Sequence, residues 1–133
     1  ILNLGTNDNN AMDNPPWTDP ATGQAYAQRP TPEHLAALEQ SAVDALKQVR
    51  ARNPQAWILW AFGMLGEGRM DAILRAAVAR VQAETGDEKI RYLSLPAAAS
   101  ETLGARRHPG VKCHAQAAQV LVSYLQNILP PRN

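Results

Sequence analysis

The residue with the clearest chemical potential is His108, which stands directly before Pro109 and an amphipathic segment. An imidazole can take a proton from a serine or water nucleophile near neutral pH. Asn7 is the second candidate, because a side-chain amide can donate a hydrogen bond to a developing oxyanion. Each also has a structural interpretation: a His at a helix start is often merely exposed, and Asn is a common turn residue. The choice between the catalytic and the structural interpretation therefore depends on where the fold places the two residues.

The elements around these residues predict a parallel sheet. Apolar segments at 1–5, 57–62 and 89–95 are typical of strands, and the middle one is an unbroken apolar run, as in a strand covered on both faces. Helical spacing of apolar residues predicts three helices, the first of which starts at Thr31 and Pro32. The other two run from about Met70 to Gly86 and from about Val111 to Leu129. The apolar face of the last one is expected to consist of Val111, His114, Ala118, Leu121, Leu125 and Ile128. Strands that alternate with helices give right-handed crossovers and an α/β fold.

Ligands of such sheets bind at the carboxyl ends of the strands. Asn7 lies just past the first strand and His108 past the third, so both are expected to face one crevice. Trp17 lies in a long Pro-rich loop or insertion at 9–31, close behind Asn7. Its ring could stack on a sugar in that crevice, or it could anchor the loop by burying itself, and the sequence leaves both open.

Composition argues against several other classes of function. The 133 residues suit a single domain. Thirteen Lys and Arg against twelve Asp and Glu give a net charge of +1, so a surface that binds nucleic acid is not expected. No apolar run approaches the roughly 20 residues that span a bilayer. Cys113 is the single cysteine, and it has no CxxC or HExxH partner with the adjacent His114. We therefore predict no metal site and no cofactor.

Two segments carry a resemblance to a known family. Leu4-Gly5-Thr6-Asn7-Asp8 and His108-Pro109, with His114 following, resemble two conserved blocks of the SGNH (GDSL-type) hydrolases. Within that superfamily the chain looks most similar to the acetyl esterases of carbohydrate esterase family 2. The resemblance implies that Asn7 is an oxyanion-hole donor and His108 the catalytic base. It also implies a three-layer α/β/α fold with a flavodoxin-like parallel sheet. Residues 1–133 would be its carboxyl-terminal portion, carrying strands 3 to 5 without the first two.

The chain departs from the family pattern in three places. It has no Gly-Asp-Ser block for the nucleophile, and its serines at 41, 94, 100 and 123 match no such motif. The block that supplies a backbone oxyanion donor is also absent. The acid that normally stands three residues before the catalytic His is replaced by Ala105. Family 2 esterases are known to lack that acid, which implies a Ser-His dyad with His108 oriented by a backbone carbonyl or another carboxylate.

The expected function follows from this resemblance. The chain would be the carboxyl-terminal part of a serine ester hydrolase that removes O-acetyl groups from carbohydrate, with its Ser outside the sequence. Its partner would be the missing amino-terminal half, from the same gene or a separate chain, and residues 1–133 alone would be inactive and unstable as a monomer. The alternative is a non-catalytic interaction or carbohydrate-binding remnant. The residues do not fix the localisation, although the resemblance favours a secreted or periplasmic protein.

Overall fold

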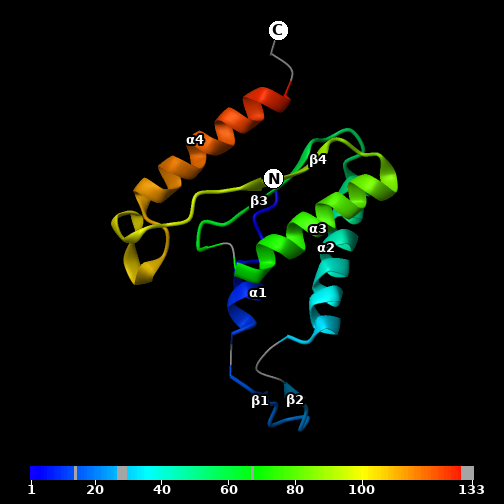
Figure 1. Cartoon of the computed structure of the whole chain (residues 1–133), viewed down its shortest axis with the longest axis vertical. Helices are drawn as coiled ribbons and strands as arrows, with labels where there is room; N and C mark the ends of the chain where they lie inside the picture. The colour runs from blue at the N-terminus through cyan, green and yellow to red at the C-terminus, as the bar shows by residue number, and fades with distance from the viewer. Residues whose placement is uncertain (14, 27–29, 67, 130–133) are drawn as a thin grey trace.

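The computed structural model describes residues 1–13, 15–26, 30–66 and 68–129. Figure 1 shows a short central sheet with helices packed around it and a small hairpin at the opposite end from the C-terminus. The alternation of helices and strands around a parallel pair confirms the predicted α/β class. In order, the elements are α1 (Thr6–Ala11), β1 (Trp17–Thr18), β2 (Ala25–Tyr26), α2 (Pro32–Arg52), β3 (Ile58–Phe62), α3 (Gly68–Thr85), β4 (Ile90–Ser94), the 3-10 turns η1 (Ser100–Thr102) and η2 (Ala105–Arg107), and α4 (Val111–Ile128).

The ends of α2 and α3 follow from local sequence signals. Thr31 caps α2, since its hydroxyl oxygen accepts a hydrogen bond from the backbone N–H of His34 at 3.4 Å, and Pro32 occupies the first helical position. Asn53 ends that helix, as the Asn-Pro pair predicts. Gly86 follows α3 with a φ of 67°, a left-handed conformation that favours glycine.

The sheet is parallel, as predicted. β3 pairs with β4 so that Ile58 lies opposite Ile90. On the other edge of β3 the amino-terminal segment also runs parallel: the N–H of Leu2 donates to the carbonyl of Leu59, and the N–H of Ala61 donates to the carbonyl of Leu2, both at 2.8 Å. The predicted strand at 1–5 is nevertheless reduced to this single bridge, because Gly5 turns the chain directly into α1.

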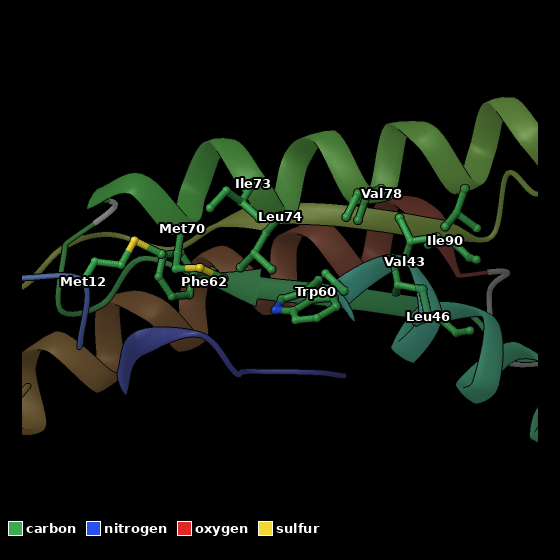
Figure 2. Close-up of a cluster of buried hydrophobic side chains, with 14 residues drawn as sticks. Met12, Val43, Leu46, Trp60, Phe62, Met70, Ile73, Leu74, Val78 and Ile90 are labelled. Carbon is green, nitrogen blue, oxygen red and sulfur yellow. The ribbon is translucent and has the colours of Figure 1, made fainter. Parts of the chain in front are cut away.

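Side chains of β3 alternate between two clusters. Those of Ile58, Trp60 and Phe62 enter the main buried cluster with α2 and α3, and Figure 2 shows the last two among Met70, Leu74 and their neighbours. Ala61 points the opposite way and packs with Leu95 and with Ala117 of α4. Burial on both faces explains the unbroken apolar run in the sequence.

The predicted buried face of α4 was wrong in its first half. Val111, His114 and Ala118 were expected to line that face, but all three are exposed. The buried positions are Cys113 and Ala117 instead. A shift of one residue rotates the buried face by about 100°, and α4 carries apolar residues on more than one side, so its pattern does not single out one face.

Segment 9–31 is more structured than the loop or insertion predicted for it. α1 continues to Ala11, and Met12 is buried in the main cluster. β1 and β2 then form an antiparallel hairpin in which Trp17 pairs with Tyr26. Strands of two residues are too short for a periodic signal in the sequence. No helix within the described ranges is both long and apolar enough to cross a membrane.

Candidate active site

Asn7 stands in the first turn of α1, just beyond the end of the amino-terminal segment. Gly5 makes the turn possible with a φ of 113°, and a Cβ there would meet Leu74, Met70 and Phe62 at 3.4 Å. The indole N–H of Trp60 donates to the carbonyl of Leu4 at 3.1 Å. The backbone before Asn7 is thus fixed to the core, while the Asn7 side chain itself is exposed.

A second asparagine fixes α1 from its other side. The side-chain oxygen of Asn9 accepts a hydrogen bond from the backbone N–H of Met70 at 3.2 Å, which caps the start of α3. Sequence reasoning missed this role, because Asn9 lies in a run of Asn and Asp with no spacing that marks α3 as its partner. The contact couples the position of Asn7 to the core helix α3.

His108 belongs to a short loop that is closed on itself. Backbone N–H groups of Gly104 and Gly110 donate to the carbonyls of His108 at 2.7 Å and Thr102 at 2.8 Å. The two glycines touch closely: a Cβ on Gly104 would come within 3.1 Å of the Gly110 Cα. The loop follows the carboxyl end of β4 and leads directly into α4, as Figure 1 shows. His108 therefore sits on a constrained backbone.

The imidazole of His108 contacts a main-chain carbonyl. Its Nδ1 lies 3.2 Å from the carbonyl oxygen of Arg106. A carbonyl can only accept a hydrogen bond, so a bond between these atoms requires the proton on Nδ1. In a neutral imidazole Nε2 is then unprotonated, which is the form a general base needs. Of the two kinds of partner for His108 that the sequence left open, the structure brings a backbone carbonyl into contact with the ring.

Backbone strain accompanies this contact. Arg106 and Arg107 have φ values of 53° and 61°, in the left-handed region that residues with side chains rarely adopt. Such conformations cost about 1–3 kcal/mol each and gather at functional sites. No sequence motif marks a carbonyl as an orienting group, so Arg106 was not predicted. In the sequence, the flanking Gly104 and Gly110 are the only signals typical of a sharp loop.

The predicted site residues lie on separate elements. Asn7 and His108 each follow the carboxyl end of a parallel segment, whereas Trp17 lies on the hairpin and is 56% exposed. At that exposure, residues 1–133 by themselves do not bury the Trp17 ring. Between described residues, no hydrogen bond joins Asn7 or Trp17 to His108. The same part of the chain has no group of three or more His, Cys, Asp or Glu placed to hold a metal ion.

Comparison with known proteins identifies the fold. The chain is similar to an acetyl xylan esterase (Est2A) from the rumen bacterium Butyrivibrio proteoclasticus, with a TM-score of 0.83 and 33% sequence identity over 94% of this chain. The predicted resemblance to the carbohydrate esterases is confirmed. No protein-family model matches the chain, and a search of curated proteins found no match. The chain spans 35% of the length of that esterase.

Proposed function

We propose that residues 1–133 form the carboxyl-terminal part of a serine ester hydrolase that removes O-acetyl groups from carbohydrate. The similarity to an acetyl xylan esterase over 94% of the chain carries this proposal. The contact between His108 Nδ1 and the Arg106 carbonyl supports it, because it leaves Nε2 available as a base. The nucleophilic Ser would come from outside residues 1–133, since the chain has no Gly-Asp-Ser block.

The first chemical step is acylation. The Ser hydroxyl oxygen attacks the acetyl carbonyl carbon while Nε2 of His108 takes the hydroxyl proton. The carbonyl oxygen becomes an oxyanion, to which the Asn7 amide donates a hydrogen bond. When the tetrahedral intermediate collapses, the protonated His108 returns its proton to the departing sugar oxygen. The products of this step are the deacetylated sugar and an acetyl-serine.

The second step is hydrolysis of that acetyl-serine. Water attacks the same carbonyl carbon, and Nε2 of His108 takes one of its protons. Collapse of the second intermediate releases acetate and returns the proton to the serine oxygen. The Arg106 carbonyl holds the ring through both steps and stabilises the charged imidazolium through the Nδ1 proton.

The exposed apolar surfaces of the chain suit the remainder of a three-layer α/β/α domain. The amino-terminal segment forms the outer edge of the sheet, and Ile1 and Leu4 on it are exposed. Beyond β4, an open groove of about 380 Å³ is lined by Leu93, Val120, Tyr124 and polar neighbours. Unpaired strand edges and apolar grooves favour association. The two missing strands and a helix would cover both surfaces, as one chain or as a separate partner.

The test is hydrolysis of p-nitrophenyl acetate and of acetylated xylan by the full-length protein containing these residues. His108→Ala should lower kcat on both substrates by about 10²–10⁴, the range for loss of a general base. Asn7→Ala should lower kcat by about 10²–10³, as for a lost oxyanion donor. His114→Ala is the matched control, because His114 is also exposed and lies on the neighbouring α4.

Equal activity of His108→Ala and His114→Ala would overturn the role of His108. Full-length protein with no esterase activity on either substrate would instead favour a non-catalytic, carbohydrate-binding remnant of the fold. Residues 1–133 produced alone should be inactive. Activity in that isolated chain, abolished by His108→Ala, would show that one of its own serines is the nucleophile.

A further inference from the structure

An exposed aromatic pair stands on the hairpin between α1 and α2. Trp17 and Tyr26 are directly opposite each other across β1 and β2. Their ring centroids lie 5.5 Å apart at an interplanar angle of 26°, so the two rings are stacked. They remain 56% and 46% exposed. Large aromatic side chains are usually buried, so a stacked pair left in solvent calls for a functional explanation.

Each ring has two faces, and the pair uses one face of each. The two residues keep 56% and 46% of their surface exposed, and we assign this exposure to the opposite, outer faces of the rings. A pyranose ring has a flat apolar face of C–H groups that matches the face of an aromatic ring in size, while its hydroxyls point outward. The pair therefore offers two stacking positions for sugar rings.

The hairpin turn is held in shape before any ligand binds. The Asp19 carboxylate accepts hydrogen bonds from the N–H of Ala21 at 2.9 Å and from the hydroxyl of Thr22 at 2.8 Å. The hydrogen bonds that Asp19 accepts hold the pKa of its carboxyl below the ordinary value, the one from Ala21 first. Backbone bonds from Asp19 to Gln24 and from Gly23 to Asp19 close the turn. A preformed surface loses little conformational entropy on binding.

The surroundings of the pair favour a neutral, hydroxyl-rich ligand over a protein. Trp17 and Tyr26 are the large exposed apolar residues of the described hairpin, whereas a stable protein interface buries about 800 Å² on each partner. Their neighbours Thr18 and Gln24 are uncharged hydrogen-bonding groups, and the charge of Asp19 is occupied within the turn. Figure 1 shows the hairpin well separated from the loop that carries His108. A ligand that reaches both must be a polymer.

We propose that Trp17 and Tyr26 form a stacking surface for a neutral polysaccharide chain, apart from the place where the ester is cleaved. The sugar class rests on the proposed function, but the surface itself does not depend on His108 or on a nucleophile. It would hold the polymer while its acetyl groups reach the catalytic residues. Small esters such as p-nitrophenyl acetate would not use it.

The test is electrophoresis of the full-length protein in gels that contain a soluble polysaccharide. One gel contains acetylated xylan, and the other contains the same xylan after mild alkali has removed its acetyl groups. Wild-type protein should be retarded by both. Trp17→Ala and Tyr26→Ala should each weaken binding about tenfold, as for one stacking ring. The double variant Trp17→Phe with Tyr26→Phe keeps two aromatic faces and should bind almost as wild type does. Gln48→Ala, a substitution of an exposed residue on α2, is the control.

A second measurement tests the proposal even if the Ala substitutions unfold the hairpin. Xylohexaose should change the tryptophan emission of the wild type, because Trp17 is exposed while Trp57 is partly and Trp60 fully buried. The double Phe variant should bind xylohexaose in calorimetry without that emission change. Binding by wild type with no change in emission, or equal binding by Trp17→Ala and wild type, would overturn the proposal.

Failure of this proposal and failure of the proposed function give different results. His108→Ala should keep wild-type binding to deacetylated xylan even where hydrolysis is lost. Binding that disappears with the acetyl groups or with His108→Ala would assign recognition to the catalytic crevice and overturn the separate surface. If the wild type binds xylan through Trp17 and Tyr26 but has no esterase activity, the proposed stacking surface is supported and the proposed esterase function is wrong.

Discussion

The two faces of the sheet differ in how completely the chain covers them. On the side of α2 and α3, the central side chains are fully enclosed, among them Val43, Leu46 and Leu74. On the side of α4, the helix buries only Cys113 and Ala117 within its described length, while Val120 and Val122 remain exposed. A helix that is apolar on its exposed side is suited to further contacts.

Ion pairs also differ between the α2–α3 side of the sheet and the α4 side. Lys47 of α2 contacts Glu84 of α3 at 2.6 Å, and Arg50 of α2 contacts Asp87 just after α3 at 2.6 Å. No ion pair between described residues involves α4. The α2–α3 side therefore resembles a finished protein core, and the α4 side resembles an interface. The chain spans 35% of the length of the similar esterase, and under the proposed function the α4 side would contact the remainder of the domain.

The largest test of this contrast removes side chains from each face. Leu74→Ala should lower the free energy of unfolding by about 2–5 kcal/mol, because it leaves a cavity in a fully buried cluster. Val122→Ala should change it by about 1 kcal/mol at most, because Val122 is 52% exposed in residues 1–133. Urea unfolding followed by circular dichroism measures both. Similar losses for the two variants would mean that the faces do not differ in this way.

The sequence predicted the framework better than the details. The helices around 32–52 and 68–85 and the strands β3 and β4 were predicted, because caps, glycines and apolar periodicity are local signals. The buried face of α4 was not, because the choice between its apolar sides depends on what packs against them. Tertiary contact alone also fixes the role of Asn9 toward Met70.

The candidate catalytic residues show the same limit. His108 and Asn7 were proposed from residue type, position and resemblance, and the structure places each beyond the carboxyl end of a parallel segment. The orienting group was left open between a carbonyl and a carboxylate. A backbone carbonyl has no residue type of its own, so only the unusual φ of Arg106 and the Nδ1 contact could reveal it.

A smaller effect is expected from the half-buried ion pair on the finished face. Burial alone would raise the pKa of Asp87, but hydrogen bonds from Arg50 and from the backbone of Lys89 outweigh it and hold the pKa below the ordinary 3.8. Because the folded-state pKa is the lower one, the pair stabilises the fold above the unfolded value. That contribution disappears as the pH falls through the folded value.

Asp87→Asn should therefore destabilise the chain by about 1–2 kcal/mol at pH 7, as for a lost charge-assisted hydrogen bond. The difference from wild type should shrink once the pH is below about 4. Urea unfolding between pH 2.5 and 7 measures this. Lys47→Met removes the more exposed pair and serves as the control with little pH-dependent change. A constant difference between Asp87→Asn and wild type across that range would contradict the assignment.

The smallest effect concerns the exposed side of α4 in the full-length protein. If the rest of the protein covers α4, Val122→Ser should lower the free energy of unfolding by about 1 kcal/mol, since a covered Val loses transfer free energy when it becomes Ser. Val122 is 52% exposed in residues 1–133, so an uncovered Val122 should give a change of less than about 0.5 kcal/mol. Leu46 lies on the enclosed face, and Leu46→Ala should cost about 2–5 kcal/mol in either case. Urea unfolding of the full-length protein measures both, and a change below about 0.5 kcal/mol for Val122→Ser would mean that the remaining part of the protein does not cover α4.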